Sequence, residues 1–142
     1  RAIAVLQASL PTILQQEHVW IQADAYLTLA KCYLQRAKDE ATDKTPTKLL
    51  RLAARELSSS ADLFRQCQDC YRLREVYYLQ ARVYNSVPQS RKLRDDASER
   101  FVRVSRHLTE CSKPVVDDFV NSLTDSSILE KLVARSIPIS AA

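Results

Sequence analysis

Glycine and methionine are both absent from the 142-residue chain. A chain of this length ordinarily has about ten glycines, placed where the backbone needs a positive φ. Without glycine, the sequence lacks the glycine-rich loops of Rossmann and P-loop nucleotide sites and the glycine elbow of the α/β hydrolases. Tight hairpins are disfavoured for the same reason. The composition therefore favours an all-helical chain.

The sequence also lacks a segment that would enter a membrane. No apolar run approaches the roughly 18 residues that a membrane-spanning helix requires, and the first residues do not have the order of a signal peptide. Because methionine is absent and apolar residues are already in phase from Ile3, we expect the sequence to be part of a longer protein. The hydrophobic share of 46% is enough for the core of one domain, which we expect to be soluble.

Disulfide bonds are not expected either. The four cysteines are Cys32, Cys67, Cys70 and Cys111. In a chain that is long enough to build its own core, thiols are more often buried than paired. We therefore expect an intracellular, reducing compartment.

Apolar residues recur at spacings of three and four along most of the chain, as on one face of a helix. The pattern predicts helices over residues 2–15 with a bend at Pro11, 17–40, 46–66, 70–86 and 91–109. Thr45, with Pro46 behind it, and Ser90 are predicted to begin the third and fifth helices. Two short helices are predicted after Thr109, one over 115–123 behind Pro114 and one over 127–136.

Short links between these helices predict antiparallel hairpins, and the hairpins share a pattern. Tyr26-x-x-Leu29-Ala30-x-x-Tyr33 matches Tyr77-x-x-Gln80-Ala81-x-x-Tyr84 further along the chain. Each is followed by a helix with a similar spacing, Ala54-x-x-x-Ser58-x-x-Ala61 and Ala97-x-x-x-Phe101-x-x-Val104. The first pattern is close to the tetratricopeptide signature, although Ser58 replaces its phenylalanine, Gln80 replaces its leucine and the period is longer.

The predicted fold is therefore all-α, with tetratricopeptide-like helical hairpins stacked as a solenoid fragment over residues 1–109. Residues 110–142 are predicted to be capping helices or a tail. A plain helical bundle is the alternative. The residues expected to pack the repeats are Tyr26, Leu29, Ala30, Tyr33, Ala54, Ala61, Tyr77, Ala81, Tyr84, Ala97 and Phe101. Ala30 and Ala81 are expected to be buried where the two helices of a hairpin touch.

Metal binding and catalysis find little support in the sequence. Cys67-x-x-Cys70 and His107-x-x-x-Cys111 have ligand types that zinc accepts, but buried cysteines more often pack as small hydrophobic residues. Neither histidine is expected to have a carboxylate or nucleophile partner at helical spacing, and the carboxylates occur as adjacent pairs that point apart on a helix. We predict no metal, no cofactor, no small-molecule substrate and no enzyme activity.

The predicted helix over 91–109 is basic. Arg100, Arg103 and Arg106 share one face, which raises nucleic acid as a possible partner. Acidic residues interleave with the arginines, and no aromatic residue alternates with them to stack bases. An acidic protein partner fits these arginines at least as well.

Several stretches resemble the subunit-five family of the anaphase-promoting complex. They are Ser9-Leu10-Pro11-Thr12-Ile13-Leu14, Ala30-Lys31-Cys32, Ala53-Ala54 leading to Ala61, and Val76-Tyr77-Tyr78-Leu79-Gln80-Ala81-Arg82-Val83-Tyr84. The last resembles the family segment V-x-Y-x-Q-A-R-x-Y, which also has glutamine where other tetratricopeptide repeats have leucine. The resemblance covers residues 3–109. It implies a non-catalytic scaffold of a cell-cycle ubiquitin ligase, in the nucleus and cytoplasm, whose partners are the other subunits.

Two other classes of interaction remain open. A peptide-binding adaptor would use the first helix of each hairpin, with Lys31, Arg74 and Arg82, whereas an RNA-binding helical repeat would use residues 91–106. The stripe Ile3, Leu6, Leu10 and Ile13 is expected to lack a cover, which predicts self-association of the isolated chain. The predicted helix over 127–136 is expected to dock beside Phe101, Val104 and Leu108.

Overall fold

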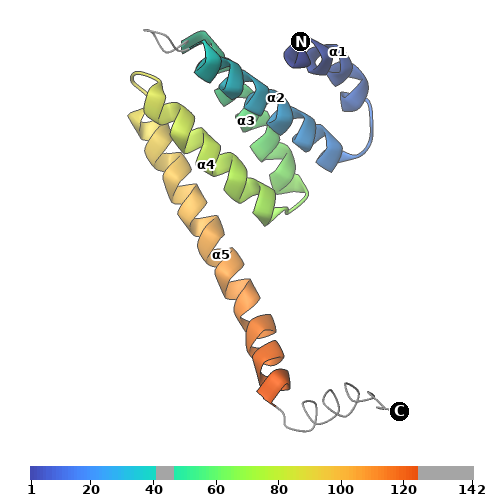
Figure 1. The fold of residues 1–142 in the computed structure, drawn as a ribbon, viewed down its shortest axis with the longest axis vertical. Coiled ribbons are helices and arrows are strands. Elements are labelled where there is room, and N and C mark those ends of the chain that lie inside the picture. Colours follow the sequence, from blue (N-terminus) through green and yellow to red (C-terminus); the bar gives the residue numbers. More distant parts are fainter. Residues whose placement is uncertain (41–46, 125–142) are drawn as a thin grey trace, which may run out of the picture. The chain divides into compact units, whose positions relative to one another are not determined.

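The computed structural model describes residues 1–40 and 47–124, with side chains up to Ser112. Its helices are α1 (Ala2–Leu14), α2 (Val19–Asp39), α3 (Thr47–Gln66), α4 (Cys70–Ser86) and α5 (Arg91–Thr124) (Figure 1). Because the described residues contain no strand, the prediction of an all-α chain is confirmed for them. The chain divides into two compact units, Arg1–Ser105 and Arg106–Ala142, and the boundary lies within α5.

The predicted helices after Thr109 are the main error. We predicted a helix that ends at Thr109 and a separate short helix over 115–123, but α5 continues from Arg91 to Thr124. A proline such as Pro114 removes one backbone hydrogen bond, and α5 continues because the helical turns before and after the proline are formed. Likewise, α1 continues through Pro11 to Leu14. The predicted helix over 127–136 and the predicted Thr45-Pro46 start lie outside the described residues.

The turns on either side of α4 each contain a glutamine with a positive φ, the conformation that glycine usually adopts. Gln68, in the turn before α4, has φ 56°, and Gln89, in the turn after it, has φ 61°. In the first turn the backbone N–H of Asp69 donates to the Phe64 carbonyl over 3.1 Å, so this carbonyl at the C-terminal end of α3 has a hydrogen-bond donor. A non-glycine residue in this left-handed conformation costs about 1–2 kcal/mol. Glutamine therefore occupies positions where glycine is the usual choice.

The main core lies among α2, α3 and α4 in the unit Arg1–Ser105. Its most completely buried side chains come from all three helices: Ala23, Leu27, Ala30, Leu57, Phe64 and Val76. Helix α3 packs against both α2 and α4. Contacts near the starts of α2 and α4 join Trp20 to Asp69, and contacts one or more turns later join Lys31 to Glu75. The helices α2 and α4 therefore run in the same direction, with α3 between them in the chain.

Helix α1 lies along α2 (Figure 1). The three leading members of the predicted open stripe, Ile3, Leu6 and Leu10, pack against a second cluster formed by Leu29, Tyr33 and Ala53. The side-chain amide of Gln7 donates to the Tyr33 hydroxyl over 2.7 Å, which fixes the same contact. The expectation that this stripe lacks a cover is wrong for Ile3, Leu6 and Leu10, because side chains of α2 and α3 pack on them.

Candidate functional site

The residues predicted to pack the repeats divide into two groups. Leu29, Ala30, Tyr33, Ala61, Tyr77 and Ala97 are buried, whereas Tyr26, Ala54, Ala81, Tyr84 and Phe101 are half-buried. Ala30 is fully buried, as predicted. The expected burial of Ala81 is wrong, because α4 and α5 leave a groove of about 550 Å³ at this position, which Ala81 and Phe101 line.

The two departures from the tetratricopeptide signature contact each other. The buried Gln80 of α4 donates from Nε2 to the Ser58 hydroxyl of α3 over 3.3 Å. The Ser58 hydroxyl in turn donates to the Ala54 carbonyl over 3.1 Å. A polar pair thus replaces the leucine and phenylalanine of the signature, and the amide of Gln80 has a hydrogen-bond acceptor inside the unit.

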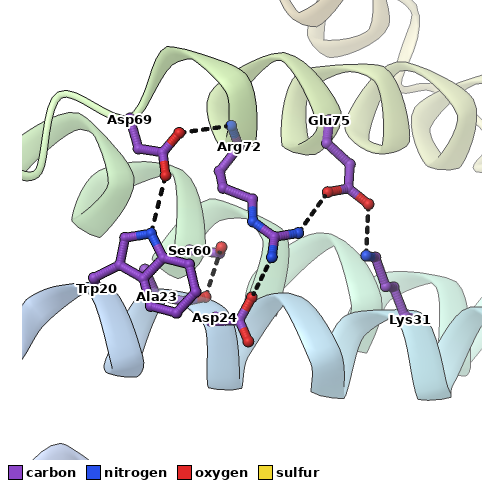
Figure 2. A network of polar contacts seen from close by, with 8 residues as sticks. All are labelled: Trp20, Ala23, Asp24, Lys31, Ser60, Asp69, Arg72 and Glu75. Atoms are coloured by element: carbon purple, nitrogen blue, oxygen red, sulfur yellow. Dashed lines mark hydrogen bonds and ion pairs between the residues drawn. The ribbon is translucent and has the colours of Figure 1, made fainter. Parts of the chain in front are cut away.

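A network of polar side chains joins α2 to α4 (Figure 2). The indole N–H of Trp20 donates to Asp69 Oδ2 over 2.9 Å, while Asp69 Oδ1 accepts from the backbone N–H of Arg72 over 3.0 Å and so caps α4. The Arg72 guanidinium reaches Asp24 of α2 at 3.5 Å and Glu75 at 3.1 Å. The network therefore links α2 and α4 in one register.

Glu75 ends the network and links it to Lys31 of α2, whose Nζ lies 2.5 Å from Glu75 Oε1. Partial burial raises the pKa of Glu75, but hydrogen bonds and positive charge from Lys31 and Arg72 outweigh burial and hold the pKa below its ordinary value of 4.5. The Arg72 guanidinium also lies over the Trp20 ring, 5.6 Å from its centroid, and Trp20 meets Phe64 edge-on. These contacts connect the network to the core.

The sequence analysis did not find this network. Its members are far apart in the chain, and the register of two parallel helices is needed to bring Asp24 to Arg72. The one local signal was Asp69, an N-cap residue type immediately before α4. Behind the network, the buried Ser60 hydroxyl donates to the Ala23 carbonyl over 2.9 Å, which joins α3 to α2 (Figure 2).

One charged side chain of α3, Glu56, is buried. Glu56 forms an ion pair with its neighbour Arg55, whose guanidinium nitrogen lies 2.6 Å away. The hydrogen bond and the negative charge of Glu56 raise the pKa of Arg55. The buried carboxylate is thus neutralised by an adjacent side chain that remains exposed.

A second groove, of about 520 Å³, lies between α2 and α4. Its α2 wall is Lys31, Leu34, Gln35 and Lys38, and its α4 wall is Leu79, Arg82, Val83 and Ser86, with Ala37 and Leu50 also in the lining. Two of the three cations that the sequence analysis named for a peptide-binding adaptor, Lys31 and Arg82, therefore face one groove. Arg74 is exposed on α4 but does not line it.

Large apolar side chains are exposed on four of the helices. They are Val5 and Leu14 on α1, Trp20 and Ile21 at the start of α2, Tyr71 and Tyr78 on α4, and Leu93 and Val102 on α5. The exposed fraction is 60% for Val5 and 52% for Val102. None of them lies on α3, which is described over its whole length. The exposed apolar side chains are therefore on the helices that precede and follow α3 in the chain.

The arginines predicted to share a face of α5 are all exposed. Within the described residues, Arg103 pairs with Glu99 over 2.7 Å, and Arg94 pairs with Asp95 over the same distance. The carboxylates that interleave with the arginines thus bind part of the positive charge. This arrangement reduces the charge that α5 offers to phosphate groups.

The cysteines are free thiols. Cys67 and Cys70 are half-buried at the turn before α4. His107 and Cys111 lie one helical turn apart on α5, with 3.5 Å between Nε2 and Sγ, so the expectation that neither histidine has a nucleophile at helical spacing is wrong for His107. In the part of the chain that the structure describes, no three histidine, cysteine or acidic side chains gather as metal ligands. That Cys67 and Cys70 hold no metal stays a prediction.

Comparisons with known proteins add no identification. No family model, no curated protein and no solved structure matches the chain. In the described residues, no helix has both the length and the apolar character needed to cross a membrane.

Proposed function

We propose that this chain is a non-catalytic scaffold module of a cell-cycle ubiquitin ligase, the role that the resemblance to the subunit-five family of the anaphase-promoting complex implies. In this proposal the hairpins α2–α3 and α4–α5 are consecutive tetratricopeptide-like repeats of a solenoid. Other subunits of the ligase, in the nucleus and cytoplasm, are the partners. The chain contributes binding surfaces rather than chemistry.

The distribution of exposed apolar side chains supports this proposal. Repeats of this kind contact only their neighbours, so a stack is closed in its middle and open at both ends. Helix α3 exposes no large apolar side chain, whereas each of the other four helices exposes two, among them Val5 on α1 and Val102 on α5. Apolar side chains that remain exposed on a folded unit mark surfaces for another protein. Such surfaces on helices that precede and follow α3 in the chain suit a scaffold, which must hold two neighbours.

Helix α1 supports the same role by its composition. Its 13 residues contain no charged side chain, and none of them is buried. One side of α1 packs on α2 and α3, so the other side presents Val5, Ala8 and Thr12 without a charge nearby on that helix. A surface helix of a protein with no further partner usually has charged residues on its outer side.

The proposal is tested by purifying a tagged form of the protein that contains this sequence from dividing cells and identifying bound proteins by mass spectrometry. We expect subunits of a ubiquitin ligase to co-purify. Val5→Asp and Val102→Asp place a charge on each exposed surface and should each reduce co-purification. Thr28→Asp adds the same charge at an exposed polar position of α2 and should not.

The proposal fails if no ubiquitin-ligase subunit is recovered. It also fails if both surface variants recover those subunits as well as Thr28→Asp does. Equal thermal unfolding of the three variants excludes a folding defect as the cause of any difference.

A further inference from the structure

We propose that the groove between α2 and α4 binds an extended acidic segment of a partner protein, with an apolar side chain on the groove floor and carboxylates on Lys38 and Arg82. This inference stands on the groove itself and does not require the scaffold role.

The shape of the groove suits an extended chain. Each wall is one stripe of a helix at spacings i, i+3, i+4 and i+7: Lys31, Leu34, Gln35 and Lys38 on α2, and Leu79, Arg82, Val83 and Ser86 on α4. A stripe of this kind is about 10 Å long. An extended peptide advances about 3.3 Å per residue, so about three of its residues fit between the walls.

The charge of the groove is positive. Among its lining residues are three cations, Lys31, Lys38 and Arg82, and no acid. Lys31 is already paired with Glu75, and the nearby Asp39 accepts a hydrogen bond from Gln35. Within the described residues, Lys38 and Arg82 have no carboxylate partner. The Arg82 guanidinium lies 5.7 Å from the centroid of the Tyr78 ring, which does not neutralise its charge, and Arg82 lines both this groove and the groove between α4 and α5.

The lining between the cations is apolar. Leu34 comes from α2, Leu79 and Val83 come from α4, and Leu50 of α3 also lines the groove. An apolar side chain of the ligand can contact these residues while the charges on either side of it meet Lys38 on one wall and Arg82 on the other. Cations on both walls distinguish this groove from a single charged stripe on one helix, because one short segment can meet both of them at once.

Fluorescence anisotropy tests the inference with a fluorescein-labelled peptide, Ser-Asp-Glu-Leu-Glu-Asp-Ser, and the whole protein. We expect saturable binding that weakens as salt is raised. The variant Lys38→Glu/Arg82→Glu should weaken binding by about tenfold or more, since two attractive contacts become repulsive. The control Arg91→Glu/Lys92→Glu has the same change of net charge at exposed positions of α5 and should change binding by less than about twofold.

Four results would overturn the inference. The first is no saturable binding by the parent protein, and the second is an equal loss in the groove variant and in the α5 control. The third is equal affinity for a peptide in which serine replaces the leucine, because the apolar residues of the groove would then contribute nothing to binding. An oligouridylate that binds more tightly than the peptide, and that Lys38→Glu/Arg82→Glu abolishes, would instead assign the groove to a nucleic acid and would also refute the acidic peptide.

Discussion

Replacing Ser58 with alanine tests the hydrogen bond that joins the two departures from the tetratricopeptide signature. In the parent protein, the buried amide of Gln80, which is 5% exposed, donates to the Ser58 hydroxyl over 3.3 Å. Ser58→Ala leaves that amide hydrogen without its acceptor. An unsatisfied buried donor costs about 1–3 kcal/mol. Because the bond is long, we expect a loss of about 1 kcal/mol in the free energy of unfolding.

The reverse change has a different expected result. Gln80→Leu removes the donor and puts an apolar side chain in a buried position. The Ser58 hydroxyl still donates to the Ala54 carbonyl, so no donor is left unsatisfied. We expect the stability of Gln80→Leu to remain within about 0.5 kcal/mol of the parent. In the double variant the orphaned amide is absent, so the cost of Ser58→Ala should largely disappear.

Urea unfolding of the parent, both single variants and the double variant, followed by circular dichroism, completes the cycle. With a slope of about 2 kcal/mol per molar urea, a loss of 1 kcal/mol moves the midpoint by about 0.5 M. We expect the two substitutions to be coupled by about 0.5–1 kcal/mol. If the effects of the two substitutions add to within about 0.3 kcal/mol, Ser58 and Gln80 do not form an energetically coupled pair.

Three further predictions concern packing, a turn and pH. Thermal unfolding should show that Ala30→Leu, which overpacks a fully buried site, lowers the free energy of unfolding by about 1–3 kcal/mol, and that Ala81→Leu beside a groove lowers it clearly less. Equal losses of stability would contradict the difference in burial. Gln68→Gly should raise stability by about 0.5–1 kcal/mol because it removes a positive-φ penalty, and a loss would show that the glutamine side chain contributes more than the backbone strain costs. Because the pKa of Glu75 is lowered in the folded protein, the contribution of Glu75 to the free energy of unfolding is present above pH 4.5 and is lost as the pH falls below this value. Glu75→Gln should therefore be less stable than the parent at neutral pH, by no more than about 1 kcal/mol, and should approach the stability of the parent in acid. A stability difference that does not shrink in acid would contradict this prediction.

The grooves and the exposed apolar side chains have different expected roles. The groove between α2 and α4 is lined by cations and apolar residues, and we assign it to a short ligand segment. Val5 and Val102 are exposed on helices that precede and follow α3 in the chain, and we propose that they contact large partner proteins. Variants on Lys38 and Arg82 should therefore affect peptide binding, whereas Val5→Asp and Val102→Asp should affect co-purification of subunits. The two proposals can fail separately.

The sequence by itself determined the helices of the first unit. The spacing of apolar residues predicted α4 with its observed bounds, Cys70–Ser86, and placed α2 and α3 within a few residues of their observed ends. This works because a helix needs only a local pattern, in which side chains three and four residues apart share a face. The same rule failed at Thr109, where polar residues and Pro114 indicated an end but the backbone hydrogen bonds of α5 continue to Thr124.

Only the tertiary structure decided which faces meet. Ala30 and Ala81 occupy equivalent places in the sequence pattern, yet one is fully buried and the other lines a groove, because burial depends on the helix that packs opposite each residue. The link from Trp20 to Asp69 and the pairing of Ser58 with Gln80 have no local signal, since each needs two helices in a particular register. Periodicity indicates which side of a helix turns inward, whereas the partner across the contact is set by the register of the packed helices.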